Sequence, residues 1–90
     1  MNNLISLRNK TALITGGSRG VGRETCRMLA RAGARVGFCY QSRKEDAEET
    51  LGLIGKEGGS GWFIQADLAT DVGISSFFTR ADREFPDGLD

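Results

Sequence analysis

The sequence predicts an α/β protein that forms one half of a doubly wound parallel sheet, in the order strand, helix, strand, helix, strand, helix. Two observations support this prediction. Short apolar runs alternate with longer segments in which apolar residues recur every three to four positions, as on one face of a helix. A cluster of glycines directly follows the first apolar run, where a strand would turn sharply into a helix. Right-handed crossovers would make the three strands parallel.

The first strand is expected at residues 11–15, Thr-Ala-Leu-Ile-Thr, a short apolar run typical of a strand buried on both faces. The first helix is expected after the glycine cluster, with Gly33 ending it. Its buried face is predicted from residues at helical spacing. These are Val21, Thr25, Met28, Leu29 and Ala32.

The second strand is expected at residues 35–40, where apolar side chains alternate weakly. Ser42 and Glu45 form a capping-box pattern that predicts the start of the second helix. The third strand is expected at residues 62–66, after a glycine-rich turn. The last helix is expected to end before Pro86. Its apolar face is predicted to comprise Ile74, Phe78, Ala81 and Phe85.

The composition excludes several functional classes. The 12 Lys and Arg residues equal the 12 Asp and Glu residues, so the chain lacks the basic excess by which proteins bind nucleic acids. No apolar run is long enough to span a membrane and the N-terminus has no signal-peptide pattern, which predicts a cytoplasmic protein without membrane contact. With two cysteines and no histidine, no metal ligands are assigned. Cys26 and Cys39 are expected to be buried side chains rather than reactive thiols.

The glycine cluster predicts a phosphate-binding turn. Unpaired N–H groups at the start of a helix and the helix dipole both favour an anion, so the amides between Ile14 and Val21 are expected to hold a diphosphate. Gly16 would allow the sharp turn, Gly20 would let the anion approach, and Gly22 would let the helix pack closely on the strand. A tight turn without a ligand is the alternative.

A P-loop for nucleoside triphosphates is not expected. Residues 17–22 have the glycine spacing of a P-loop, but Arg23 and Glu24 stand where a Lys and a Ser or Thr would hold phosphate and Mg²⁺. The three-residue gap between Gly16 and Gly20 also departs from the Gly-x-Gly-x-x-Gly fingerprint of many dehydrogenases.

The turn, Thr-Gly-x-x-x-Gly-x-Gly at residues 15–22, closely resembles the signature of the short-chain dehydrogenases/reductases, nicotinamide-dependent oxidoreductases with a Rossmann fold. The likeness extends to residues 7–14, to Gly-Ala-Arg-Val at 33–36 and to Ala-Asp-Leu at 66–68. It implies hydride transfer between a nicotinamide cofactor and a carbonyl or alcohol substrate. The turn is also similar to that of 3-oxoacyl-(acyl carrier protein) reductases, which implies a 3-oxoacyl thioester substrate by analogy alone.

NADP is the expected cofactor rather than NAD. No carboxylate stands at the end of the second strand, where NAD-binding proteins place one against the ribose 2′-hydroxyl. Arg19, Arg43 and Lys44 lie nearby, and guanidinium groups suit a 2′-phosphate. A solvated first helical turn is the alternative for Arg43 and Lys44, and the resemblance implies that Asp67 contacts the adenine. The candidate cofactor-binding residues are Gly16, Ser18, Arg19, Gly20, Val21, Gly22, Tyr40, Ser42, Arg43, Asp67 and Leu68.

No catalytic residue is assigned. The family uses a Tyr, a Lys four residues further on and a Ser. Tyr40 and Lys44 have this spacing, but they are expected beside the adenosine ribose, away from the nicotinamide. We therefore interpret residues 1–90 as a single partial NADP-binding domain that ends before a fourth strand and is inactive by itself. The alternatives are a stand-alone nucleotide-binding module and an inactive fragment.

In a sheet of order 3-2-1-4, the first strand would lie at an unpaired edge if the fourth were missing. This predicts weak stability, or self-association through residues 11–15 of another copy. The expected partners are therefore the cofactor, a carbonyl substrate in the full enzyme, and either a second copy or a missing C-terminal part.

Overall fold

The computed structural model describes residues 10–17 and 20–88. Strands and helices alternate along the chain, as the sequence predicts. The elements are β1 (Thr11–Thr15), α1 (Gly20–Arg31), β2 (Arg35–Tyr40), α2 (Lys44–Lys56), β3 (Ser60–Gln65) and α3 (Asp71–Glu84). The start of β3 lies before the predicted residue 62 because Ser60 and Gly61 already pair with β2.

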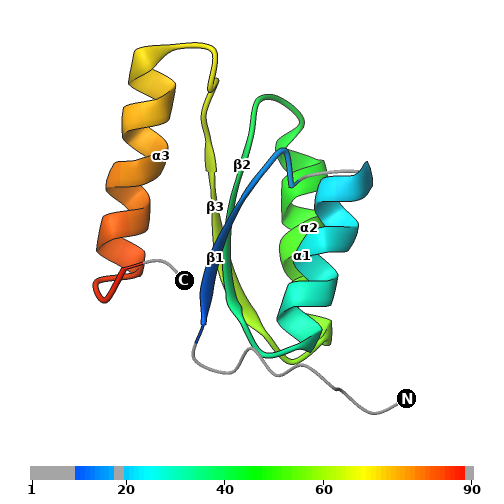
Figure 1. The fold of residues 1–90 in the computed structure, drawn as a ribbon. Helices are drawn as coiled ribbons and strands as arrows, with labels where there is room; N and C mark the ends of the chain where they lie inside the picture. The colour runs from blue at the N-terminus through cyan, green and yellow to red at the C-terminus, as the bar shows by residue number, and fades with distance from the viewer. Residues whose placement is uncertain (1–9, 18–19, 89–90) are drawn as a thin grey trace.

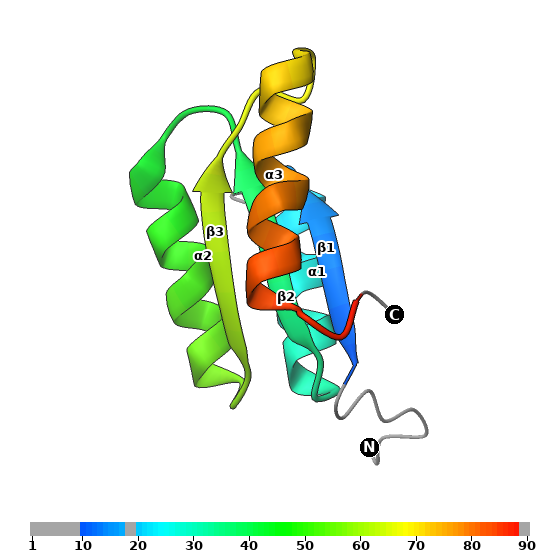
Figure 2. The same cartoon turned by 90° about the vertical axis from the view of Figure 1, so that its left-hand side faces the viewer.

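The three strands form one parallel sheet in the order β1-β2-β3, so β2 is central. Leu13 of β1 lies opposite Gly37 of β2, and Gly37 lies opposite Trp62 of β3. Helices α1 and α2 cover one face of the sheet, and α3 covers the other (Figure 1 and Figure 2). This arrangement confirms the predicted half of a doubly wound fold.

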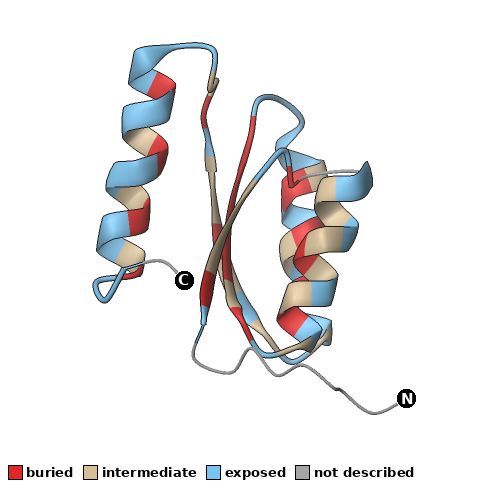
Figure 3. Cartoon of the chain, viewed as in Figure 1, coloured by how far each residue is buried: buried red, intermediate tan, exposed pale blue. Residues whose placement is uncertain are grey.

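Two apolar clusters fill the space between the layers, and Figure 3 shows their buried residues facing the sheet. The cluster under α1 and α2 comprises Cys26, Ala30, Ala34, Val36, Phe38, Tyr40, Ala47 and Ile54. The cluster under α3 comprises Cys39, Trp62, Ala66, Phe77, Ala81 and Phe85. Neighbouring residues of β2 enter opposite clusters, because successive side chains of a strand point to opposite faces. The central strand is therefore buried on both sides.

The buried face of α1 differs from the predicted one. Cys26 and Ala30 are its buried residues, whereas Val21 and Met28 are 84% and 65% exposed. Arg23 bonds to Thr50 of α2 and Arg27 bonds to Glu57 just past the end of α2, so this flank of α1 faces α2. The pattern of apolar residues was correct for a helix, but only part of it is the buried face, because Leu29 packs against the core and Val21 and Met28 do not.

The orientation of α3 also differs from the prediction. Ile74 and Phe78 are 41% and 50% exposed, and Phe77 is buried instead, while the other two predicted residues are buried as expected. A close approach at the helix start explains the difference. A β-carbon on Gly73 would lie 1.9 Å from the carbonyl oxygen of Asp67, so only a glycine allows this side of the helix to turn inward.

The predicted cap of α2 is wrong. The helix begins at Lys44, and Arg43 precedes it in the left-handed region, with φ 63° and no side-chain bond to the helix start. Ser42 does not cap the helix, because the left-handed residue separates it from the first turn. In contrast, α3 is capped by Thr70, whose hydroxyl accepts a hydrogen bond from the N–H of Gly73 at 2.9 Å.

Across residues 10–17 and 20–88, each helix is too short or too polar to cross a bilayer. In the same part of the chain, acidic and cysteine side chains do not gather in threes where a metal ion could be held.

Candidate nucleotide site

The glycine turn connects the end of β1 to the start of α1. Gly16 has φ 67° and Gly20 has φ 62°, both in the left-handed region that side-chain-bearing residues rarely adopt. The chain therefore bends sharply at two positions where glycine is needed for the backbone alone. Ser18 and Arg19, two of the predicted cofactor-binding residues, lie outside the described residues.

Gly22 is needed because the helix touches the turn. A β-carbon on Gly22 would lie 2.1 Å from the carbonyl oxygen of Gly16 and 3.0 Å from the α-carbon of Gly17. The first turn of α1 thus rests on the glycine turn itself, which is a closer contact than the predicted packing against the strand. This contact fixes the direction in which the start of the helix points.

The start of α1 is accessible to an anion. A β-carbon on Gly20 would meet no atom within 4 Å. The first turn of the helix has no acidic residue to compete for its unpaired N–H groups and the positive end of its dipole. One amide of the predicted cradle is already used, however. The N–H of Gly17 donates to the carbonyl of Cys39 at 3.2 Å, which continues the pairing of β1 with β2 past the end of the strand.

A cleft of about 380 Å³ opens beside this turn, at the carboxyl ends of the three strands. Small-molecule sites in proteins begin at about this size. In open α/β sheets, ligands bind at this edge. The cleft is lined by Gly16, Cys39, Tyr40, Gln41, Ala66, Asp67, Leu68 and Ala69.

Part of this lining was predicted and part was missed. The structure brings Gly16, Tyr40, Asp67 and Leu68 together, although they come from three separate segments. It adds four residues that the sequence analysis did not assign to the site, which are Cys39, Gln41, Ala66 and Ala69. Only their position in the sequence could have identified them, because each lies near the carboxyl end of a predicted strand or in the loop that follows it. Ala66 and Ala69 have no polar side-chain atoms, and Cys39 is buried.

Asp67 is fixed in place by its own loop. Its carboxylate Oδ1 accepts a hydrogen bond from the N–H of Ala69 at 2.9 Å. Its carbonyl accepts bonds from the N–H of Thr70 at 3.1 Å and from the Thr70 hydroxyl at 2.9 Å. This arrangement leaves Oδ2 as the carboxylate oxygen that the described residues do not use. The side chain is therefore held at the cleft with one acceptor to offer.

Tyr40 lines the cleft but belongs mainly to the core. Its side chain is 6% exposed, and its ring packs edge-on against Phe63 with centroids 5.6 Å apart. The carbonyl of Tyr40 accepts a hydrogen bond from the N–H of Ala66 at 2.9 Å, which joins β2 to the end of β3. The Tyr40 side chain therefore presents little surface to a ligand.

Ser42 and Arg43 lie next to the cleft without lining it. Both are exposed residues of the loop between β2 and α2. The structure gives the guanidinium group of Arg43 no bond to any described residue, and the backbone of Arg43 holds the left-handed conformation described above. The loop therefore places one uncommitted positive charge beside the carboxyl end of β2.

Arg23 is directed away from the glycine turn. Its guanidinium donates to the hydroxyl of Thr50 at 2.9 Å and to the carbonyl of Asp46 at 3.0 Å, and it pairs with Glu49. These are all residues of α2. Arg23 thus ties α1 to α2, which agrees with the expectation that it does not act as the phosphate-binding residue of a P-loop.

Both cysteines are buried, as predicted. Burial raises the pKa of the Cys26 thiol to about 12. Burial also raises the pKa of Cys39, the one cysteine at the cleft, and a backbone hydrogen bond from Gly16 opposes this rise. Neither residue has the electropositive surroundings that create a nucleophilic thiolate.

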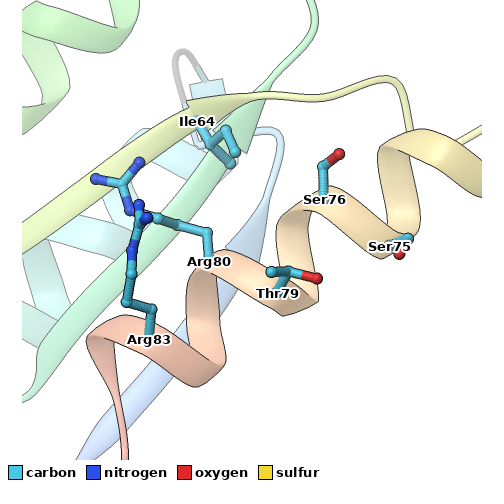
Figure 4. A pocket seen from close by; sticks show the side chains of 6 residues that line it. All are labelled: Ile64, Ser75, Ser76, Thr79, Arg80 and Arg83. Carbon is cyan, nitrogen blue, oxygen red and sulfur yellow. The ribbon is translucent and has the colours of Figure 1, made fainter.

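A second cleft, of about 310 Å³, lies between α3 and β3 (Figure 4). It is lined by Ile64, Ser75, Ser76, Thr79, Arg80 and Arg83. Arg80 is already engaged, because its Nε donates to Glu84 at 2.9 Å and its guanidinium lies 5.3 Å from the centre of the Trp62 ring. This cleft includes neither the glycine turn nor the loops after the strands, so it is separate from the candidate nucleotide site.

Comparison with known proteins identifies the family. The sequence profile described as short chain dehydrogenase matches residues 10–90. The chain is 40% identical over 72 residues to the uncharacterized oxidoreductase YgfF of Escherichia coli K12, across 80% of this chain and 29% of that protein. It is 40% identical over 76 residues to the trihydroxynaphthalene reductase PfmaI of Pestalotiopsis fici, across 84% of this chain and 27% of that protein.

Solved structures agree with the sequence matches. A short-chain dehydrogenase/reductase from Serratia marcescens has a TM-score of 0.88 and is 33% identical, across 93% of this chain and 34% of that chain. A dehydrogenase/reductase from Sinorhizobium meliloti 1021 has a TM-score of 0.88 and is 35% identical, across 94% of this chain and 33% of that chain. The chain thus spans about a third of these proteins. The fold, the glycine turn and the profile together establish that it belongs to the short-chain dehydrogenase/reductase family.

Proposed function

We propose that this chain is the NADP-binding portion of a reductase that transfers hydride between NADPH and a carbonyl substrate. The observation that carries the proposal is the glycine turn at the start of α1, which opens beside the cleft at the carboxyl ends of the strands. The family binds nicotinamide dinucleotides, and the residues at this edge suit the polar half of such a molecule.

The parts of the site suit different parts of the cofactor. The open start of α1, at Gly20 and Gly22, suits the diphosphate, since a side chain at either position would interfere with the turn or block the anion. Asp67 and Leu68 suit the adenine, because they combine one unused carboxylate oxygen with a half-buried apolar surface.

The loop after β2 favours NADP over NAD. Between Tyr40 and Arg43 there is no carboxylate to accept the ribose 2′-hydroxyl or to repel a 2′-phosphate. Arg43 is exposed and uncommitted, so its guanidinium can bind the phosphate through charge-assisted hydrogen bonds. Arg19 and Ser42 are the further candidates for this contact, on the sequence evidence alone.

When bound, the cofactor supplies the hydride. We assign no residue of this chain to the carbonyl substrate or to the proton donor. Relatives bear names as different as trihydroxynaphthalene reductase and 1-cyclohexenylcarbonyl-CoA reductase, so a match over this segment favours no single substrate. Tyr40 is buried in the core, so we do not propose it as the proton donor. The 3-oxoacyl thioester stays a prediction by analogy.

Calorimetric titration of the chain with NADPH and with NADH tests the proposal. We expect NADPH to bind at least about tenfold more tightly, since a charge-assisted bond to a phosphate contributes about 1.5–3 kcal/mol. Arg43→Ala should weaken NADPH binding about tenfold and leave NADH binding unchanged. Arg83→Ala, which removes an exposed arginine of α3 that does not line the candidate nucleotide site, is the matched control.

The alternatives divide at nucleotide binding. Selective binding of NADPH supports both the proposal and a stand-alone nucleotide-binding module. An inactive fragment would bind neither cofactor. Equal affinity for NADPH and NADH would contradict the NADP assignment but leave the nucleotide site intact, and turnover of a ketone by this chain would show that its catalytic residues had been overlooked.

A further inference from the structure

The side chain of Gln65, the last residue of β3, bonds to the loop that follows β2. Its Nε2 donates a hydrogen bond to the carbonyl of Gln41 at 2.9 Å. A carbonyl only accepts, so the nitrogen of the Gln65 amide and not its oxygen must face Gln41. Gln65 itself is not among the residues that line the candidate nucleotide site. An effect of Gln65 on a bound cofactor would therefore act through this loop.

The position of Gln65 in the sheet explains why its side chain meets the loop. Phe63 packs against the cluster under α1 and α2, and residues two apart on a strand share a face, so Gln65 lies on the same side of the sheet. The chain runs from β2 to α2 on this side and passes the carboxyl end of β3 on the way (Figure 2). Gln65 also stands opposite Tyr40 in the sheet, which puts its amide within reach of the residue after Tyr40.

Backbone bonds fix both ends of the loop but not its middle. At one end, the carbonyl of Tyr40 accepts from the N–H of Ala66 at 2.9 Å. At the other end, the carbonyl of Arg43 accepts two bonds from the first turn of α2, at 3.0 and 3.3 Å. Between them, the bond from the Gln65 side chain is the one hydrogen bond to residues 41–42 from any residue of 10–17 and 20–88.

The loop holds Arg43 in a backbone conformation that needs support. Arg43 has φ 63°, in the left-handed region where a residue other than glycine is strained. Such a conformation persists only where its surroundings fix it. The bond at Gln41 lies two residues before Arg43 and keeps the intervening peptide groups from rotating. Without this bond, the loop would be free to relax and to carry the Arg43 guanidinium away from the carboxyl end of β2.

We propose that Gln65 is a positioning residue for the choice of cofactor. By holding Gln41, it keeps Arg43 where the guanidinium can bind the 2′-phosphate of NADP. This inference rests on the proposed function, in which Arg43 makes that contact, and extends it to a residue outside the site. NADH carries a hydroxyl in place of the phosphate, so the position of Arg43 should matter for NADPH alone.

Calorimetric titration with NADPH and with NADH tests the proposal. Gln65→Ala should weaken NADPH binding about threefold to fivefold and change NADH binding less than about twofold. In a chain that already carries Arg43→Ala, Gln65→Ala should cause no further loss, because two residues that act through one contact are not additive. Ser60→Ala is the matched control, since it removes an exposed polar side chain from the opposite end of β3.

Hydrogen exchange gives a second measurement that needs no cofactor. The N–H groups of Asp46 and Ala47 donate to the carbonyl of Arg43, so release of Arg43 should expose them to solvent. In Gln65→Ala, these two amides should exchange about threefold to tenfold faster. The amide of Glu57, just past the other end of α2, should exchange at an unchanged rate.

The outcomes separate this proposal from the proposed function. If the unmodified chain prefers neither cofactor, the NADP assignment fails and this inference falls with it. If Arg43→Ala removes the preference and Gln65→Ala retains it, only the role of Gln65 is overturned. Equal losses of NADPH and NADH affinity, additive losses in the double variant, or unchanged exchange at Asp46 and Ala47 would each overturn that role as well.

Discussion

Gly22 lies so close to Gly16 that a β-carbon on Gly22 would stand 2.1 Å from the Gly16 carbonyl oxygen. The first turn of α1 and the glycine turn are therefore one rigid unit. This relationship decides where the unpaired amides of the helix point, because the helix cannot tilt without separating from the turn. The candidate diphosphate site consequently depends on two glycines six residues apart rather than on a flexible loop.

Gly22→Ala is the first test of this unit. The added methyl group must displace backbone atoms, and we expect a loss of about 1–3 kcal/mol of unfolding free energy together with loss of NADPH binding. Urea denaturation followed by circular dichroism measures the first effect and calorimetry the second. Gly52→Ala is the control, because a β-carbon there meets nothing within 4 Å and alanine favours the helix by about 1 kcal/mol. Equal effects of both substitutions would contradict the close contact.

The two helix starts give a second prediction. Thr70→Ala should lower the unfolding free energy by about 1 kcal/mol, because its hydroxyl accepts the hydrogen bond from Gly73 at the start of α3. Ser42→Ala should have no comparable effect, since Ser42 does not cap α2. Urea denaturation of the two variants compares the same chemical change at a real cap and at a position where only the sequence pattern suggests one. A larger loss for Ser42→Ala would mean that α2 begins earlier than the structure indicates.

The order of elements could be predicted from sequence because each strand is a compact apolar run and because the turn after β1 needs glycines for its backbone conformation. The sequence did not predict which face of each helix is buried. Val21 and Met28 have helical spacing, yet Cys26 and Ala30 are the residues of α1 that are buried against the sheet. For α3, the close approach of Gly73 to Asp67 explains which face turns inward. A search for apolar residues at helical spacing overlooks this contact, because glycine has no apolar side chain.

The candidate site shows the same limit. The glycines could be identified because their backbone requirement is visible in the sequence. Cys39 and Ala66 could not, because they line the cleft only through their position at the ends of strands. Tyr40 was predicted for its place at the end of β2, but the alternation of side chains along the strand directs its ring into the core.

Glu57 gives a prediction for pH. It accepts hydrogen bonds from Arg31 at 3.0 Å and from Arg27 at 3.2 Å, and these arginines, Arg31 first, lower the pKa of its carboxyl below the ordinary value of 4.5. A carboxyl whose pKa is lower in the folded state stabilises the fold above its unfolded pKa. This stabilisation is present above about pH 4.5 and is lost as the pH falls through the lower, folded value.

Glu57→Gln should therefore reduce stability slightly at pH 7, and the difference from the unmodified chain should shrink as the pH falls below about 4.5. The effect is small because solvent still reaches this partly buried cluster and screens its charges. Urea denaturation at pH 7 and at successively lower pH measures the difference. Glu48→Gln, at an exposed position of α2, serves as the control. A difference that grows with acidification would have the wrong sign for a lowered pKa.

Arg43 gives the prediction that separates stability from function. It is the one residue other than glycine with positive φ among residues 10–17 and 20–88, at φ 63°. A side chain in this region costs about 1 kcal/mol, which a glycine avoids. Arg43→Gly should therefore raise the unfolding free energy by up to about 1 kcal/mol, although it removes a residue that we place against the 2′-phosphate.

The same variant should lose its preference for NADPH. Affinity for NADPH should fall about tenfold toward that for NADH, while NADH binding stays unchanged, because only the contact to the 2′-phosphate is removed. Arg43→Lys is the matched control, since it keeps a positive charge and the left-handed strain but loses the planar guanidinium, and it should show an intermediate preference without any gain in stability. If Arg43→Gly became more stable and kept its full preference for NADPH, Arg43 would be an exposed loop residue and the 2′-phosphate would have to be bound elsewhere.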